Sequence, residues 1–331
     1  MRKLAYLAAS LVMVFTLAGC GEDNTQTNTV TVVSGVDRKL VQALADRYNT
    51  MPGVKTKVQV ADPKKGEEAD MVLEGSGQLK KLASEGQLQA AGSVYGDLVP
   101  LDLKDPQDLW LGLFYDPAVI LVNHAYSRRL GQENLQHWDD LKKLKEARLV
   151  MENLTDSDST RMFLACMASR MGQDQFLDYF RGIRHLILQY AKFPITPVRM
   201  TATGDADIAL TRRSYVFKYL QDDFPAYILI PGEGTPVNLY GAGIRKATKK
   251  QEACRNFINW MLHDPEARNV LLSQKCGYLP VLPRGEKGKA VDSGKLWTNT
   301  FYKDDAALDG LSQTWLSQIR LTQTNAEEER K

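Results

Sequence analysis

Residues 110–123 read Trp-Leu-Gly-Leu-Phe-Tyr-Asp-Pro-Ala-Val-Ile-Leu-Val-Asn. The aromatic run ends at Asp116-Pro117, which predicts a turn, and the apolar run from Val119 to Val122 predicts a buried strand. We expect this strand to carry the chain out of one α/β lobe and into a second one. A later strand, Tyr227 to Ile230, is expected to begin the return.

Strands and helices alternate on both sides of this crossing. Val30 to Val33 and Ala69 to Leu73 predict strands, and each is followed by a turn of small residues and an amphipathic helix. Strand, turn and helix in repetition indicate a mainly parallel sheet with helices on its faces. The fold class expected is therefore α/β, with two lobes that are each a mainly parallel sheet flanked by helices and joined by hinge strands.

The N-terminus has the pattern of a secretory signal. Arg2 and Lys3 precede an apolar stretch that ends in Leu17-Ala18-Gly19-Cys20. The small residues before Cys20 resemble the lipobox of bacterial lipoproteins, which implies cleavage before Cys20 and a lipid on its thiol. The alternative is a cleaved signal followed by an incidental cysteine. Residues 20–28 then form a polar tether.

Charge and cysteine content limit the classes of function. The chain has 42 Lys and Arg against 40 Asp and Glu, and loss of Arg2 and Lys3 with the signal leaves a balanced charge. This balance gives no support for nucleic-acid binding. An extracytoplasmic location permits a disulfide between Cys254 and Cys276, and buried free thiols are the alternative.

A series of short motifs resembles the type 2 periplasmic solute-binding proteins of ABC importers, in the branch of ferric-iron, phosphonate and sugar-phosphate binders. Each motif is weak alone, and their order makes the match. They are Ala69-Asp70, Trp110 to Asn123, Trp138-Asp-Asp-Leu141, Gly204-Asp-Ala-Asp-Ile-Ala209, Pro231-Gly-Glu-Gly234, Phe257-Ile-Asn-Trp-Met-Leu262 with Asp264-Pro-Glu266, and Gly277-Tyr-Leu-Pro280.

The resemblance implies a solute enclosed between two lobes. The segments expected are a signal peptide (1–19), a lipidated tether (20–28), a first lobe (29–119 with 237–324), a second lobe (120–236) and a disordered tail (325–331). It further implies a lipid-anchored monomer in the cell envelope that delivers a small ligand to an ABC permease, with no cofactor.

Iron-binding members of this branch carry two adjacent tyrosines just after the Gly-Asp-Ala-Asp-Ile-Ala segment. The corresponding pair here is Ser214-Tyr215, so only the second tyrosine is present. We therefore expect an anionic ligand, such as a phosphonate, organophosphate or carboxylate. A ferric-iron or iron-chelate binder is the alternative, and a receptor that presents its ligand to a membrane sensor kinase is a second one.

Candidate ligand residues of the second lobe follow predicted strands. Ser157, Ser159 and Thr160 stand at a helix start, where free N–H groups and hydroxyls can bind an anion or simply cap the helix. Arg212 lies at a strand end, where open sheets place ligand residues, and its guanidinium can clamp an oxyanion. A solvated arginine, or one paired with Asp222 or Asp223, is the alternative. Tyr215 can donate its phenol or cover the cleft floor.

Candidate residues of the first lobe are Ser34-Gly35 and Ser76-Gly77, which lie between strand and helix. Small residues there let backbone amides approach a ligand, although turn chemistry alone also requires glycine. Tyr115 is expected either to line the cleft or to pack in a core.

Signals of catalysis are poor. The four histidines are scattered without metal-ligand spacing, and no nucleophile or phosphate-loop motif occurs. We therefore expect a binding protein, with neither catalytic nor metal-ligating residues.

Overall fold

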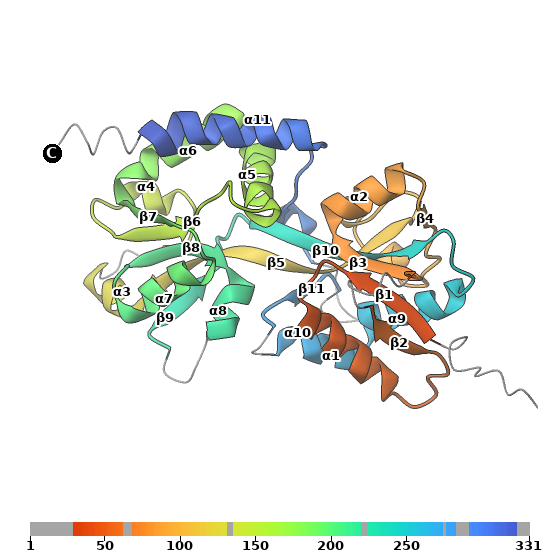
Figure 1. Cartoon of the computed structure of the whole chain (residues 1–331). Helices are drawn as coiled ribbons and strands as arrows, with labels where there is room; N and C mark the ends of the chain where they lie inside the picture. Colours follow the sequence, from red (N-terminus) through yellow and green to blue (C-terminus); the bar gives the residue numbers. More distant parts are fainter. Residues whose placement is uncertain are drawn as a thin grey trace, which may run out of the picture.

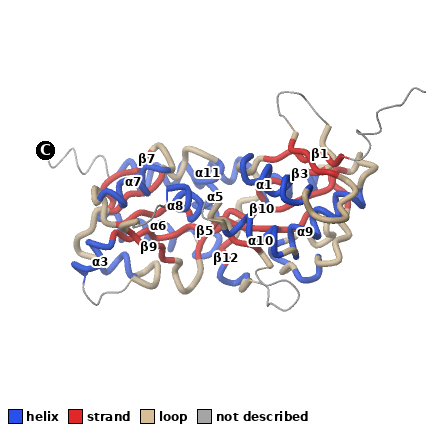
Figure 2. Tube along the Cα trace, turned by 90° about the horizontal axis from the view of Figure 1, so that it is seen from below, coloured by secondary structure: helices blue, strands red, loops and turns tan. Residues whose placement is uncertain are grey.

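The computed structural model describes residues 29–61, 68–130, 135–219, 224–273, 276–282 and 291–322. The predicted signal peptide, the tether with Cys20 and the tail 325–331 lie outside these ranges. The described chain forms two α/β lobes joined by the long strands β5 (Trp110–Asn123) and β10 (Thr235–Arg245), as Figures 1 and 2 show. The predicted fold class is confirmed.

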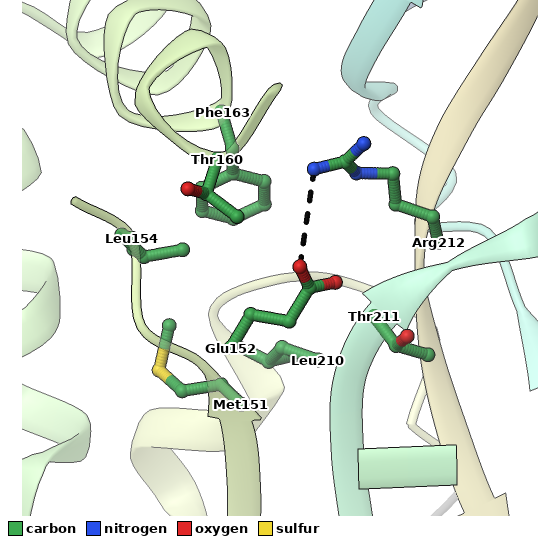
Figure 3. Close-up of a pocket in the computed structure, with 8 residues that line it drawn as sticks. All are labelled: Met151, Glu152, Leu154, Thr160, Phe163, Leu210, Thr211 and Arg212. Carbon is green, nitrogen blue, oxygen red and sulfur yellow. Dashed lines mark ion pairs between the residues drawn. The ribbon is translucent and has the colours of Figure 1, made fainter. Parts of the chain in front are cut away.

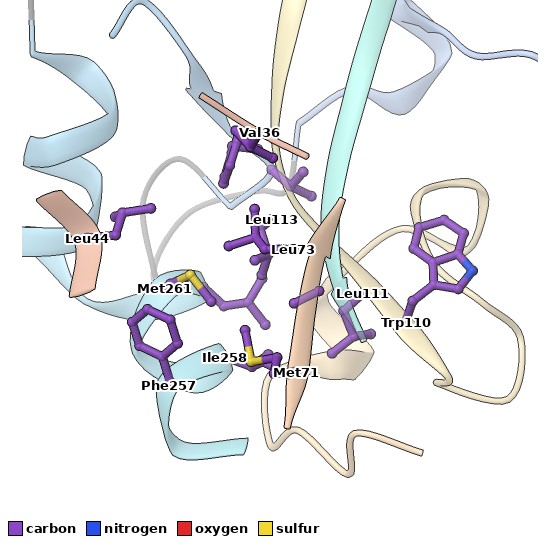
Figure 4. Packing of buried hydrophobic residues seen from close by; sticks show 14 of the residues in the cluster. Val36, Leu44, Met71, Leu73, Trp110, Leu111, Leu113, Phe257, Ile258 and Met261 are labelled. Atoms are coloured by element: carbon purple, nitrogen blue, oxygen red, sulfur yellow. The ribbon is translucent and has the colours of Figure 1, made fainter. Parts of the chain in front are cut away.

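The first lobe is built on one sheet. Strand β1 pairs in parallel with β2 and β3, while β10 runs antiparallel to β3 and to the first half of β5. Helices cover the sheet because each turns an apolar stripe inward, as α1 does with Leu40, Val41 and Leu44. Figure 4 shows Leu44 in this core. The elements are β1 (Thr29–Ser34), α1 (Arg38–Asn49), β2 (Lys57–Val60), β3 (Met71–Gly75), α2 (Ser76–Ser84), β4 (Leu88–Gln89), α9 (Gln251–His263), α10 (Pro265–Leu272) and β11 (Leu279–Pro280).

The second lobe repeats this plan with a sheet that is covered on both faces. Strand β6 pairs in parallel with β7 and β8, and β8 and β9 both pair antiparallel with the second half of β5. The elements are α3 (His124–Leu130), α4 (Asp140–Lys143), β6 (Leu149–Glu152), α5 (Asp158–Met171), α6 (Gln173–Ile183), β7 (Ile187–Ala191), α7 (Ile195–Thr203), β8 (Ile208–Arg212), α8 (Arg213–Tyr219) and β9 (Ala226–Leu229).

Strand β5 is the element that both sheets share. Its residues 110–117 pair with β10, and its residues 118–122 pair with β8. Side chains alternate, so that Ile120 and Val122 pack on one face of the second sheet and Val119 and Leu121 on the other. The buried strand predicted for Val119 to Val122 is confirmed.

The turn predicted at Asp116-Pro117 is wrong. Both residues lie inside β5, opposite Asn238 and Val237 of β10. Pro117 lacks an N–H, and it stands where β5 changes from one sheet to the other, so few ladder bonds are lost there. The buried Asp116 instead accepts hydrogen bonds from the second lobe.

The C-terminal segment packs on the lobe opposite to the one expected. We predicted residues 237–324 for the first lobe, but the side chains of Trp297, Leu311, Trp315 and Ile319 join the core of the second. Strand β12 (Leu296–Trp297) leads to helix α11 (Asp305–Trp315), which continues as a π-helical turn to Arg320 and lies across α5 and α6 (Figure 1). The apolar stripe of α11 thus packs on the second lobe.

Helix α6 ends at Ile183, and strand β7 follows, whose Leu188 and Gln189 are exposed. Trp138 to Lys145 forms only the short helix α4.

Among the cysteines that the structure describes, Cys166, Cys254 and Cys276 are all free, and the first two are buried.

Candidate functional site

Arg212, the last residue of β8, lies beside the strands that join the lobes. Its Nη1 donates to Ser159 Oγ in the first turn of α5, and Asn238 Nδ2 of β10 donates to the same oxygen at 2.8 Å. The structure therefore brings together two predicted site residues, Ser159 and Arg212. It adds Asn238, which no local motif in the sequence marked.

Acidic groups surround the Arg212 guanidinium. Glu152 Oε2 lies 4.0 Å from Arg212 Nη2, and both side chains are less than a tenth exposed. Burial alone would lower the pKa of Arg212, and the carboxylates of Glu152 and Asp116 raise it above its ordinary value. Burial raises the pKa of Glu152, an effect that Arg212 partly offsets. Arg212 is thus a buried cation close to Glu152 of its own lobe and Asp116 of the crossing strand, and not the solvated residue that was the alternative.

A small pocket lies beneath this pair (Figure 3). It has a volume of only about 20 Å³ for the centre of a water-sized molecule, and the Arg212 and Glu152 side chains point toward each other across it. Thr160 and Phe163 of α5 contribute to one wall. The complete lining is Met151, Glu152, Leu154, Thr160, Phe163, Leu210, Thr211 and Arg212.

Ser214 and Asp116 link the second lobe to the crossing strand. Asp116 Oδ1 accepts from the Ser214 backbone N–H at 3.0 Å, and Asp116 Oδ2 accepts from Ser214 Oγ–H at 2.5 Å. Burial raises the pKa of Asp116, and the nearby Arg212 counteracts this rise. Iron binders of the resembled branch carry a tyrosine at this position. Here it is Ser214, whose hydroxyl donates to the buried Asp116 carboxylate.

The two predicted tyrosines have different surroundings. Tyr215 on α8 lies beside Arg212, whose Cζ is 5.5 Å from the ring centroid. Tyr115 is 8% exposed and packs in the core of the first lobe, which fits the core alternative. Burial raises the pKa of both phenols, so each is protonated at neutral pH.

The predicted donors at the α5 N-terminus are mostly used by the helix itself. Ser157 and Thr160 form a capping box, in which Thr160 N–H donates to Ser157 Oγ at 3.2 Å and Ser157 N–H donates to Thr160 Oγ1 at 3.1 Å. These two residues therefore serve as caps. Ser159 is the one of the three that contacts Arg212.

The first-lobe turns are also engaged internally. Ser34 Oγ–H donates to the Leu73 carbonyl at 2.8 Å and accepts from Val36 N–H at 3.0 Å. Burial raises the pKa of Glu74, and the nearby backbone N–H groups of Gly35 and Gly75 offset part of this rise. An added Cβ at Gly35 would lie only 2.1 Å from Glu74 Oε2, so the Glu74 side chain would have to move to accommodate it. Sequence reasoning did not identify Glu74.

Ser76 and Gly77 open helix α2 on the side that meets the second lobe. An added Cβ at Gly77 would lie 3.6 Å from the Met162 Cε of α5. On another side, Lys218 Nζ of α8 pairs with Asp37 Oδ2 at 2.7 Å, and Arg213 Nη1 donates to the Gly277 carbonyl. The lobes therefore touch through contacts of α2 with α5 and of α8 with first-lobe loops.

The described residues contain neither a cluster suited to a metal ion nor a helix suited to span a membrane. In these ranges no three His, Cys, Asp or Glu side chains gather as a metal site. Nor does any helix in the described part of the chain have the length and apolarity needed to cross a membrane.

Comparison with known families identifies the class of protein. The family model of bacterial extracellular solute-binding proteins matches residues 66–302. The chain belongs to this family, whose members bind and transport solutes and are not enzymes. The predicted resemblance is thereby confirmed at the level of the family.

Two curated relatives are similar over part of their length. Iron uptake protein A1 of Synechocystis sp. is 24% identical over 228 residues, which cover 64% of this chain and 60% of that protein. An uncharacterized protein of Haemophilus influenzae is 28% identical over 102 residues, which cover 30% of this chain and 29% of that protein. The chain thus spans less than two thirds of both relatives.

Solved structures share the fold at low sequence identity. The periplasmic binding protein AfuA of Actinobacillus pleuropneumoniae, with fructose-6-phosphate bound, has a TM-score of 0.64 and 20% identity, covering 88% of this chain and 99% of that one. Iron-bound HitA of Pseudomonas aeruginosa has a TM-score of 0.63 and 19% identity, covering 88% and 98%. One fold thus accommodates an anionic sugar in one protein and iron in another.

Proposed function

We propose that this protein captures a small organic anion between its two lobes and delivers it to an ABC importer. The ligand is a phosphonate, an organophosphate or a carboxylate. In this proposal Cys20 carries a lipid that holds the protein, as a monomer, at the outer face of the membrane. The first lobe consists of residues 29–119 with 237–282 and 291–296, and the second consists of residues 120–236 with the C-terminal segment 297–320.

The observation that carries the proposal is the buried Arg212 guanidinium beside Ser159, Asn238 and Tyr215. A guanidinium has five N–H donors in a fixed fork, which matches the paired oxygens of a carboxylate or phosphate. Ser159 and Tyr215 supply hydroxyls next to it, and Asn238 supplies an amide from β10. An oxyanion at this position would contact residues of the second lobe and of a crossing strand at once.

Capture would be coupled to closure of the lobes about β5 and β10. A ligand favours the closed form only through contacts that the open form lacks. A shift from about 1:99 to 99:1 requires roughly 5.5 kcal/mol of differential binding. Two or three charge-assisted hydrogen bonds to Arg212 and its neighbours are of this order, since each contributes about 1.5–3 kcal/mol.

Isothermal titration tests the proposal. Protein freed of its natural ligand is titrated with phosphate esters, phosphonates, carboxylates and ferric citrate, and the same panel is run on Arg212→Gln. We expect an anion to bind the wild type and to lose about a hundredfold or more in affinity with Arg212→Gln. Arg199→Gln, at an exposed position of α7, is the matched control and should bind normally. Heat only with iron would contradict the anion proposal.

Iron binding is the second candidate, and it is supported by the similarity to Iron uptake protein A1. Tyr215, Tyr240 and Tyr278 would be its phenolate ligands. The rings of Tyr240 and Tyr278 lie 5.7 Å apart, and Tyr215 and Tyr240 both lie near Arg212. A ferric–phenolate complex would be coloured, and Tyr215→Phe would remove the absorbance. The engagement of Ser214 by Asp116 favours the anion over iron.

A further inference from the structure

Glu152, the last residue of β6, is a buried carboxylate without a hydrogen bond beside the proposed anion site. The shortest distance between it and Arg212 is 4.0 Å, from Oε2 to Nη2, which is too long for a hydrogen bond. Within the described part of the chain no hydrogen bond reaches the Glu152 carboxylate. A buried carboxylate in these surroundings is costly to keep charged, so its ionisation depends on the nearby guanidinium.

The pocket that Glu152 shares with Arg212 also contains an unused hydroxyl. Thr211 lines this pocket (Figure 3), and its buried Oγ1 has no hydrogen-bond partner among the described residues. A hydroxyl oxygen can accept from the O–H of a protonated carboxyl group. The pocket volume of about 20 Å³ for the centre of a water-sized molecule exceeds the roughly 10–15 Å³ that one water needs. The surroundings of Glu152 therefore suit its neutral form as well.

The charged groups that act on Glu152 favour opposite forms of it. Burial raises the pKa of Glu152, Arg212 partly offsets this rise, and the negative charge of Asp116 on β5 adds to it. Asp116 differs from Glu152 because it accepts two hydrogen bonds from Ser214, which stabilise its charge. The other elements around Glu152 contribute Ala191 of β7, Thr160 and Phe163 of α5, and the protonated phenol of Tyr215 on α8.

An anion that binds Arg212 would add a second negative charge beside Glu152. Two acids would then share one guanidinium, and like charges at close range disfavour the charged form of the less stabilised acid. We propose that capture of an anion at Arg212 is coupled to the uptake of one proton by Glu152. The proton comes from the solvent and bonds a carboxylate oxygen, and the resulting O–H can donate to Thr211 Oγ1 or to the anion. This inference rests on the proposed function, because Arg212 must hold the anion.

The coupling gives the affinity a pH dependence of defined sign. The pKa of Glu152 is already raised in the ligand-free protein, and a bound anion raises it further. Between these two pKa values binding takes up a proton, so the affinity falls as the pH rises, by about tenfold per pH unit at most. Below the lower value Glu152 is already neutral, and above the upper value it stays charged in the complex.

Isothermal titration in two buffers counts the protons. Methylphosphonate, ethyl phosphate and propionate are the probes, and Tris and bis-Tris are suitable buffers because they are amines with different enthalpies of ionisation and do not compete as anions. The change of observed heat between the buffers gives the number of protons bound with each anion. At several pH values we compare the wild type with Glu152→Gln, which removes the contribution of the probe itself. In the window between the two pKa values we expect the wild type to take up about 0.5–1 proton more than Glu152→Gln.

A matched control and a second measurement accompany the titration. Glu146→Gln, at an exposed position of the same lobe, should take up as many protons as the wild type, and circular dichroism checks that both variants are folded. Infrared difference spectra need no variant. When methylphosphonate, ethyl phosphate or isotope-labelled propionate binds the wild type, a protonated carboxyl band should appear as a carboxylate band disappears. Equal proton uptake by the wild type and Glu152→Gln, or an unchanged carboxylate band, would overturn the coupling.

Failure of the coupling can be told apart from failure of the proposed function. If a probe binds the wild type and Arg212→Gln abolishes that binding, but Glu152→Gln leaves proton uptake unchanged, only the coupling fails. If none of the probes binds the wild type, the anion function fails, and the coupling that rests on it fails as well.

Discussion

The hydrogen-bonded pair of Ser214 and Asp116 joins the second lobe to the crossing strand and occupies the Ser214 hydroxyl. The carboxylate is fully enclosed, and its two hydrogen bonds both come from Ser214. Because a buried carboxylate that loses a donor keeps its desolvation penalty, this pair contributes strongly to stability.

We predict that Ser214→Ala lowers the free energy of unfolding by about 1–3 kcal/mol at neutral pH. The folded-state pKa of Asp116 is raised, so its neutral form becomes populated as the pH falls through that value. A neutral carboxyl needs fewer donors, and the loss should therefore shrink at acidic pH. Urea denaturation at several pH values measures it. Ser317→Ala, on the C-terminal helical segment, is the control, and equal stability of both variants would contradict the prediction.

Glu152 is expected to compete with an anionic ligand for Arg212. We predict that Glu152→Gln tightens anion binding several-fold at neutral pH, because one negative charge near the guanidinium is removed. Burial raises the pKa of Glu152, so the wild type should approach the variant as the pH falls through that raised value. Titrations at a series of pH values test this. Glu85→Gln, at an exposed position, should change nothing, and a weaker anion affinity in Glu152→Gln would argue against the competition.

At the scale of elements, the C-terminal helix completes the second lobe. Trp315 of α11 is fully buried, with ring centroids 4.6 Å from Phe180 and 5.9 Å from Phe176 of α6. Without α11 these aromatic rings would face solvent, so the element is a required part of that core.

We predict that Trp315→Ala destabilises the protein by about 3–5 kcal/mol, the usual cost of removing a large buried aromatic side chain. Thermal and chemical denaturation measure the change. Leu321→Ala, in the same helical segment but 55% exposed, should cost far less. Similar losses in the two variants would mean that α11 does not pack on α6 as described.

At the scale of the whole molecule, contacts between the lobes set their separation. Lys218 of α8 and Asp37, the cap of α1, pair at 2.7 Å across the two lobes, and both side chains are partly exposed. An ion pair of this kind contributes little to global stability, about 0–1 kcal/mol, but it exists only while the lobes are close.

We predict that Lys218→Gln leaves the unfolding midpoint nearly unchanged and increases the radius of gyration of the ligand-free protein. High salt should enlarge the wild type in the same way, because it screens the pair. Small-angle X-ray scattering at low and high salt measures both effects. Lys145→Gln, an exposed control, should resemble the wild type, and a compact Lys218→Gln protein would show that the pair does not hold the lobes together.

Patterns that extend over a few neighbouring residues already predicted the α/β class, the crossing strand at Val119 to Val122 and the family. Side-chain period and turn residues act locally, so they can be read from a short window of sequence. The prediction of a turn at Asp116-Pro117 failed because a proline is tolerated where a strand changes sheets, a situation that no local window contains.

Other properties depended on which distant segments meet. Glu74 covers the Gly35 amide, Asn238 reaches Ser159, and α11 packs on α6 rather than on the first lobe. The side chains in each of these contacts come from separate elements, and their charges and hydrogen bonds are defined only when the lobes are assembled. Residue types and periodicity specify what each element can offer, whereas packing between remote elements determines which donor, acceptor or apolar face it meets.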